Sequence, residues 1–116
     1  MKRGDVVVVP FPFQDRLGEK IRPAIVVQSN SENLRLPNTI LAMVTGNLSD
    51  RGHPTNFLID PSTPEGACCG LSGPSLVKCC NLATMRQNRV IRVIGSLSHC
   101  QIQDLNNCLK VALDLP

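Results

Sequence analysis

Short apolar runs, each stopped by a proline, a glycine or a polar loop, constrain the fold of this chain more than any other feature. The first run, residues 6–9, consists of four valines and ends at Pro10, and such a β-branched run is typical of a buried strand. Further runs of this kind lie at residues 23–27, 39–45, 56–59, 76–82 and 90–97. Because helices are usually longer than these runs, the pattern predicts a mostly β fold built from short strands.

The segments between the runs are polar or rich in proline and glycine. We expect loops at residues 14–21, 48–54 and 61–74, and one short helical turn within residues 29–38 that Pro37 stops. Gly95 stands near the end of the last run, where it predicts a β-bulge.

The end of the chain has a different period. After Ser98, apolar residues recur at the spacing of one helix face: Ile102, Leu105, Leu109, Ala112 and Leu113. Several short strands followed by one terminal helix predict a closed or half-closed antiparallel barrel, with the helix over one opening.

Length and charge limit the function classes. A chain of 116 residues has room for one hydrophobic core, so residues 1–116 are expected to form a single domain. The net charge of +3 is compatible with a nucleic-acid partner, but three Phe without Trp or Tyr argue against a broad base-stacking platform. No secretory leader and no run near the ~20 apolar residues of a membrane span is present, which predicts a cytoplasmic protein without a membrane partner.

The six cysteines have the wrong spacing for a zinc site. Zinc ligands usually come as C-x2-C pairs, whereas Cys68-Cys69 and Cys79-Cys80 are adjacent and would point to opposite faces of a strand. Most of the six are therefore expected to be small buried residues, with a metal site or redox chemistry as alternatives. We expect no metal and no cofactor.

Two residues stand where an apolar run meets a polar loop. Arg22 precedes Pro23, which favours extended backbone and fixes the direction of a guanidinium able to bind phosphate. Thr45 ends its apolar run and offers a hydroxyl at a strand terminus. Taken singly, each is better explained as structural than as catalytic, and His53 and His99 are better explained as a solvated loop residue and as local structure, respectively.

Several motifs occur in the order found in one family. They are Gly4-Asp5-Val6, Ile21-Arg22-Pro23-Ala24-Ile25-Val26-Val27, Met43-Val44-Thr45, Pro54-Thr55, the stretch from Pro74-Ser75 to Ala83-Thr84, and Gly95-Ser96-Leu97. This series resembles that of the MazF/PemK toxins of type II toxin–antitoxin systems and covers nearly the whole chain.

The resemblance implies an SH3-like, CcdB-type antiparallel β-barrel with a C-terminal helix. It also implies a homodimer that cleaves single-stranded RNA at short sequences, without a metal, and that a cognate MazE-like antitoxin silences. By the same resemblance, Arg22 and Thr45 bind and activate the scissile phosphate, and the ribose 2′-OH attacks it to give a 2′,3′-cyclic phosphate and a 5′-OH. Such cleavage of mRNA would inhibit translation and growth.

The resemblance also suggests residues that contact RNA. Lys78 occupies a basic position suited to phosphate, and Asn81 can read a base edge through its amide. Lys20 and Asn47 stand in the variable segments 14–21 and 46–54, which are expected to set the recognised sequence.

One position departs from the family pattern. Cys80 stands where many relatives carry an acid, so the group that moves the proton is not identified from the sequence. Two alternatives stay open: a CcdB-like toxin that binds gyrase and cleaves nothing, and an inactive SH3-like binding module.

Overall fold

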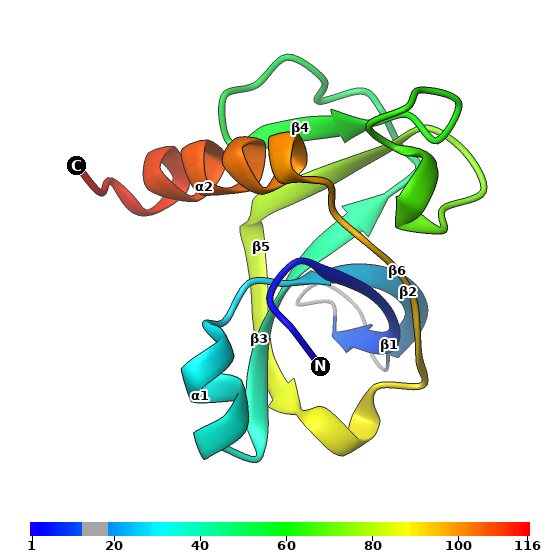
Figure 1. Cartoon of the computed structure of the whole chain (residues 1–116). Helices are drawn as coiled ribbons and strands as arrows, with labels where there is room; N and C mark the ends of the chain where they lie inside the picture. Colours follow the sequence, from blue (N-terminus) through cyan, green and yellow to red (C-terminus); the bar gives the residue numbers. More distant parts are fainter. Residues whose placement is uncertain (13–18) are drawn as a thin grey trace.

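The computed structural model describes residues 1–12 and 19–116 of the chain, and their arrangement is shown in Figure 1. The strands are β1 (Asp5–Pro12), β2 (Glu19–Val26), β3 (Asn38–Thr45), β4 (Asn56–Ile59), β5 (Ser75–Arg86) and β6 (Arg92–Ser96). The α-helices are α1 (Asn30–Arg35) and α2 (His99–Leu113), and two single-turn 3-10 helices are η1 (Ala67–Cys69) and η2 (Gln87–Arg89).

All the described strands belong to one antiparallel sheet with the order β4-β5-β3-β2-β1-β6. The sheet curls into a half-barrel, and α2 lies beside β4 and β5, well away from α1, which flanks β3 (Figure 1). The predicted mostly β fold with a C-terminal helix is therefore confirmed, in its half-closed form.

The curled sheet buries apolar side chains on both of its faces, which explains why the strands read as continuous apolar runs. One core lies under α2 and contains Val6, Ile25, Ala42, Val44, Phe57, Ile59, Cys69, Val77, Cys79, Leu97, Leu105 and Cys108. The other core lies on the opposite face and contains Val7, Val9, Phe11, Ala24, Val26, Leu41, Met43 and Met85. We call this second side the Met43 face.

The first two strands are longer than the sequence predicted. β1 continues through Pro10 to Pro12, and β2 begins at Glu19 instead of residue 23. The reason is that β6 pairs with β1 only up to Val8, so the later part of β1 has a single neighbour and tolerates prolines that lack an N–H. The predicted loop 14–21 is wrong at residues 19–21, and residues 13–18 lie outside the described part.

β5 is also longer than predicted and contains an insertion. Ala42 pairs with Leu82 while Met43 pairs with Lys78, so three residues of β5 bulge out opposite a single step of β3. β6 begins two residues later than predicted, but the predicted bulge beside Gly95 is confirmed by the register shift opposite Val6 and Val7.

Both predicted helical segments are confirmed. α2 follows Ser98, whose hydroxyl accepts from the N–H of Gln101 while the Gln101 side chain accepts from the Ser98 N–H. This capping box satisfies two of the N–H groups at the helix end. The loop expected at 61–74 is irregular apart from the single turn of η1.

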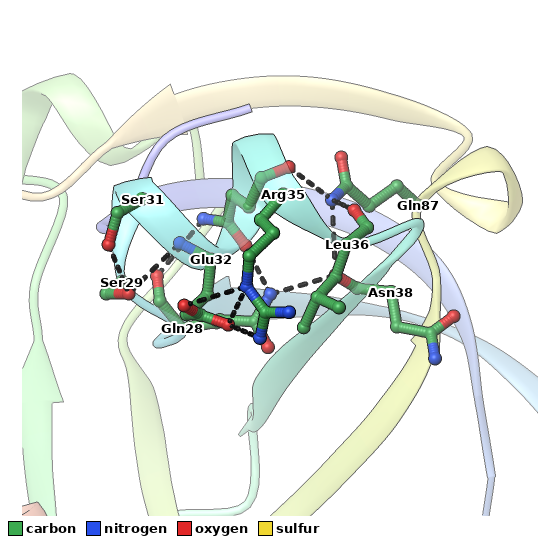
Figure 2. Close-up of polar contacts among 9 residues, drawn as sticks. Gln28, Ser29, Ser31, Glu32, Arg35, Leu36, Asn38 and Gln87 are labelled. Carbon is green, nitrogen blue, oxygen red and sulfur yellow. Dashed lines mark hydrogen bonds and ion pairs between the residues drawn. The ribbon is translucent and has the colours of Figure 1, made fainter.

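A network of polar side chains joins α1 to the sheet (Figure 2). The buried Asn33 side chain accepts from Gln28 Nε2 at 2.9 Å and from the fully buried Thr39 hydroxyl at 2.7 Å. Gln87, the first residue of η2, donates to the carbonyls of Asn33, Leu36 and Asn38. The short α1 is thus held mainly by tertiary hydrogen bonds, since six residues are too few for a stable isolated helix.

The six cysteines are free thiols, of which Cys69, Cys79 and Cys108 are buried and the other three are exposed. The expectation that most are buried is therefore wrong, because each adjacent pair places one thiol inside and one outside. Burial raises the pKa of Cys79 to about 12 and that of Cys69 to about 11.

Within the described residues no group of three or more His, Cys, Asp or Glu side chains could hold a metal ion. No helix in this part of the chain is long and apolar enough to cross a membrane.

Candidate RNA-cleavage site

Arg22 projects from β2 on the Met43 face. It pairs with Val9 of β1 and shares the alternation of Ala24 and Val26, all of which belong to the core on that face. Its side chain is half-buried. Within residues 1–12 and 19–116, no hydrogen bond or ion pair engages its guanidinium, so its fork of donors is available to a ligand.

Thr45 is the last residue of β3 and lies on the same side. The register of β2 against β3 ends at the pair Ala24–Met43, and continuing it by two residues places Arg22 opposite Thr45. The Thr45 hydroxyl oxygen accepts a hydrogen bond from the N–H of Asn47 at 3.1 Å. Because a hydroxyl has one proton and two lone pairs, this contact leaves its proton free to donate.

Lys78 extends the cationic surface onto β5. It pairs with Met43 of β3 and with Asn56 of β4, which places it on the Met43 face. Its ammonium group lies 3.7 Å from the Asp50 carboxylate, and its side chain is 27% exposed. Lys78 is therefore held in an ion pair while it still reaches solvent.

Cys80 and Asn81 lie in the bulge of β5. Asn81 is exposed, and its side-chain amide donates to the Met43 sulfur at 3.8 Å, which places this amide on the Met43 face. Cys80 is exposed while its neighbour Cys79 is buried. The bulge thus places the Asn81 amide on the same face as the cations.

Lys20 and Asn47 lie at the margin of the site. Lys20 is exposed and pairs with Phe11, a residue of the Met43 face, so the two cations of β2 are on one side of the strand. Asn47 lies beyond the end of β3, and its side-chain oxygen accepts from the N–H of Ser49 at 3.0 Å. Asn47 thus shapes the loop, and it adjoins the face instead of projecting from it.

Two residues near Lys78 were not predicted from the sequence. Asn56 is buried, and its side-chain amide donates to the carbonyl oxygen of Asp50 at 3.2 Å and to the carboxylate at 3.1 Å. Asp50 falls within the segment 46–54 that was expected to set sequence specificity. Its ion pair joins residues far apart in sequence, so no local motif marks it.

The two histidines lie in different elements, and each contributes to local structure there. The Nδ1 of His53 lies 2.9 Å from the Thr55 hydroxyl, two residues away, and His99 is the exposed first residue of α2. In the described part of the chain, neither histidine side chain forms a hydrogen bond or ion pair with Arg22, Thr45 or Lys78.

The site therefore combines three cations, a strand-terminal hydroxyl and a carboxamide on one sheet face. The sequence profile of the family described as PemK-like, MazF-like toxin of type II toxin-antitoxin system matches residues 2–113 of the chain. The chain belongs to this toxin family.

Individual relatives agree with this membership. The toxin is 28% identical over 116 residues to the endoribonuclease MazF of Staphylococcus saprophyticus, with 99% of this chain and 92% of that protein covered. It is similar to the Mycobacterium tuberculosis toxin MazF-mt6 with a TM-score of 0.76 and 25% identity over 97% of this chain and 98% of the other.

The fold is also shared with an endoribonuclease solved in complex with its cognate antitoxin from a mycobacterial species. That structure superposes with a TM-score of 0.78 at 24% identity and covers 100% of this chain and 97% of the other. The predicted family is confirmed, and the roles of Arg22, Thr45, Lys20, Asn47, Lys78 and Asn81 stay predictions.

Proposed function

We propose that this toxin is a sequence-specific endoribonuclease that cleaves single-stranded RNA, including mRNA, without a metal ion. Relatives named endoribonucleases support the reaction class. The observation that carries the proposal is that Arg22, whose guanidinium has no protein partner among the described residues, shares one face with Thr45 and Lys78. Such a constellation fits a phosphodiester, which carries its charge on oxygens that accept several hydrogen bonds.

In the proposed reaction the nucleophile is the ribose 2′-OH next to the scissile phosphate. Its attack forms a 2′,3′-cyclic phosphate and releases a 5′-OH product. Arg22 stabilises the charge that develops on the phosphoryl oxygens, and the free proton of the Thr45 hydroxyl donates to one of them. Because the substrate brings its own nucleophile, the step requires no metal-bound hydroxide.

The other polar residues would hold the RNA strand. In this proposal Lys20 and Lys78 contact neighbouring phosphates, and their position on the same side of the sheet as Arg22 and Thr45 supports it. The amides of Asn47 and Asn81 are suited to base edges, which carry the sequence information. The segments 14–21 and 46–54 adjoin Arg22 and Thr45 along the chain. We propose that they determine which RNA sequence is recognised.

The proposed biological setting follows from the family. We infer that the chain is a single cytoplasmic domain that acts as a homodimer, inhibits translation and growth, and is silenced by a cognate MazE-like antitoxin. The relative solved in complex with its cognate antitoxin supports the last point.

The direct test is cleavage of a long mixed-sequence RNA by the purified protein in EDTA. We expect discrete fragments whose ends carry a 2′,3′-cyclic phosphate and a 5′-OH, and no fragments from Arg22→Ala. Sequencing of the fragment ends would give the recognised sequence. RNA that stays intact with the wild-type protein would refute the proposed function and would favour a toxin that binds a protein target.

A further inference from the structure

The proposed cleavage step needs a group that takes the proton from the 2′-OH, and the residues so far assigned to the site do not supply one. The Arg22 guanidinium offers hydrogen-bond donors and no acceptor. The Thr45 hydroxyl and the Asn81 amide are neutral donors and poor bases. Lys78 is held in an ion pair as a cation. Among the described side chains, Asp50 brings a carboxylate, a suitable proton acceptor, to this face.

Asp50 reaches the face because two neighbouring strands hold it. Asn56 of β4 and Lys78 of β5 are paired in the sheet, and both contact the Asp50 carboxylate. The buried Asn56 also binds the Asp50 carbonyl oxygen, so the backbone and the side chain of Asp50 are fixed by one amide. A carboxylate held at both ends in this way has a defined position before substrate binds.

Both contacts to the Asp50 side chain fall on the same oxygen. Asn56 Nδ2 lies 3.1 Å from Oδ2, and Lys78 Nζ lies 3.7 Å from the same atom. Among the described residues nothing engages Oδ1, which keeps its lone pairs on a side chain that is 55% exposed. The arrangement orients the carboxylate through one oxygen and presents the other to a ligand.

The loop after β3 connects Thr45 to Asp50 through a series of turns. The N–H of Asn47 binds the Thr45 hydroxyl, the N–H of Ser49 binds the Asn47 side chain, and the N–H of Arg51 binds the carbonyl of Leu48. These successive turns fold the loop onto β4 and β5. Thr45 pairs with Leu76, so Lys78 is its diagonal neighbour, at a typical Cα separation of roughly 7–8 Å.

We propose that Asp50 is the general base of the cleavage reaction, an inference that rests on the proposed function. The 2′-OH proton passes to Asp50 Oδ1 as the 2′-oxygen forms its bond to phosphorus. The bond from phosphorus to the 5′-oxygen of the next nucleotide breaks, and that oxygen takes a proton from water. Asp50 then returns its proton to solvent, which restores the carboxylate and balances the step.

The test compares wild type, Asp50→Asn and Asp104→Asn in single-turnover cleavage of one RNA that contains the recognised sequence. Asp50→Asn keeps the shape of the side chain, and its amide oxygen can still accept the hydrogen bond from Asn56, but the amide cannot serve as the base. We expect its cleavage rate to fall on the order of 100-fold to 10,000-fold. Asp104 is an exposed carboxylate on α2, which packs against the opposite core, so its variant should cleave at the wild-type rate.

A binding measurement separates chemistry from structure. Affinity for an RNA with a 2′-deoxy residue at the cleavage position should change less than about threefold in Asp50→Asn, and its thermal midpoint should match wild type within about 2 °C. A loss of affinity as large as the loss of rate, or a cleavage rate within threefold of wild type, would overturn the assignment. Wild-type protein that does not cut RNA would instead refute the proposed function itself.

The pH profile supplies the readout that a purely structural role would not change. Among the described residues, the groups that contact the Asp50 side chain are Lys78 from β5 and the uncharged Asn56 from β4, while the nearby His53 donates its backbone N–H to the Asp50 carbonyl at 3.4 Å. We expect the rate to rise with pH on the acid side in wild type and in His53→Gln, and this rise to be absent in Asp50→Asn. If the rise persists in Asp50→Asn and disappears in His53→Gln, Asp50 is not the base.

Discussion

The hydroxyl oxygen of Thr45 accepts the backbone N–H of Asn47 at 3.1 Å, at the point where β3 ends and its loop begins. This contact gives Thr45 two functions at once. It terminates the strand with a side-chain turn, and because the hydroxyl oxygen accepts in it, the hydroxyl proton stays free to donate. A structural role and a catalytic role are therefore compatible at this position.

Substitutions at Thr45 can separate these two roles. Thr45→Ser keeps the hydroxyl, and we expect it to cleave RNA within about tenfold of wild type. Thr45→Val keeps the shape and loses the donor, and we expect a fall on the order of 100-fold in the cleavage rate, as for loss of one donor to a developing oxyanion. Single-turnover rates measure both, and equal rates for Val and Ser would contradict a donor role.

Lys20 tests the proposed path of the RNA backbone. Because Lys20 is exposed two residues from Arg22 on the same side of β2, Lys20→Ala should weaken RNA binding at all sequences alike. The slope of log affinity against log salt should become shallower by about 0.7, the value for one phosphate contact on a single strand. Lys110→Ala, an exposed cation on α2, is the matched control and should leave the slope unchanged.

The sequence predicted the strands best where the apolar run is buried on both faces. Val6, Val7 and Val9 of β1 and residues 41–44 of β3 are buried by the two cores, so these residues alone mark the strands. The ends were predicted poorly, because pairing decides them: Pro10 and Pro23 are tolerated where the strand has one neighbour, and no local signal reports that.

The candidate site was predictable in part for the same reason. Arg22 and Thr45 each occupy the junction of a strand and a loop, which the sequence displays, and their shared face follows from strand register. The contact between Asp50 and Lys78 depends on how a loop folds back onto the sheet, and the contact between Asn81 and Met43 depends on a bulge. Neither has a periodicity that a single sequence could reveal.

The polar network around α1 is expected to contribute to stability. Asn33→Ala removes the acceptor shared by Gln28 and Thr39 and leaves the buried Thr39 hydroxyl without its partner. We expect the free energy of unfolding to fall by about 2 kcal/mol, the cost of an unsatisfied buried polar group. Urea denaturation measures the change. Leu34→Ala, at a side chain of the same helix that is 91% exposed, should stay within about 0.5 kcal/mol of wild type.

The six thiols should differ in their reaction with an aromatic disulfide reagent. Cys68, Cys80 and Cys100 are exposed, so three thiols should react quickly in the native protein. The buried Cys69, Cys79 and Cys108 should react only in denaturant, because burial raises their pKa and blocks access. The stoichiometry of released chromophore before and after denaturation checks this, and six fast thiols would contradict the described packing.

The raised pKa of Cys79 also predicts how stability depends on alkaline pH. The unfolded thiol titrates near its ordinary value of 9.0, whereas burial raises the pKa of Cys79 in the folded protein to about 12. Between these values the unfolded state has lost the proton that the folded state keeps, so the free energy of unfolding falls as the pH rises from about 9 toward 12. Below pH 9 both states keep the proton and this contribution to stability is fully present.

A matched pair of adjacent variants isolates this effect of Cys79. Cys79→Ala removes the buried thiol, and we expect the fall in unfolding free energy between pH 8 and pH 10.5 to become shallower than in wild type, although the protein is less stable throughout because a cavity forms. Cys80→Ala removes the exposed neighbour and should reproduce the wild-type fall. Urea unfolding at a series of pH values measures both slopes. The same slope in the two variants would mean that the thiol buried between α2 and the sheet does not retain its proton as its burial requires.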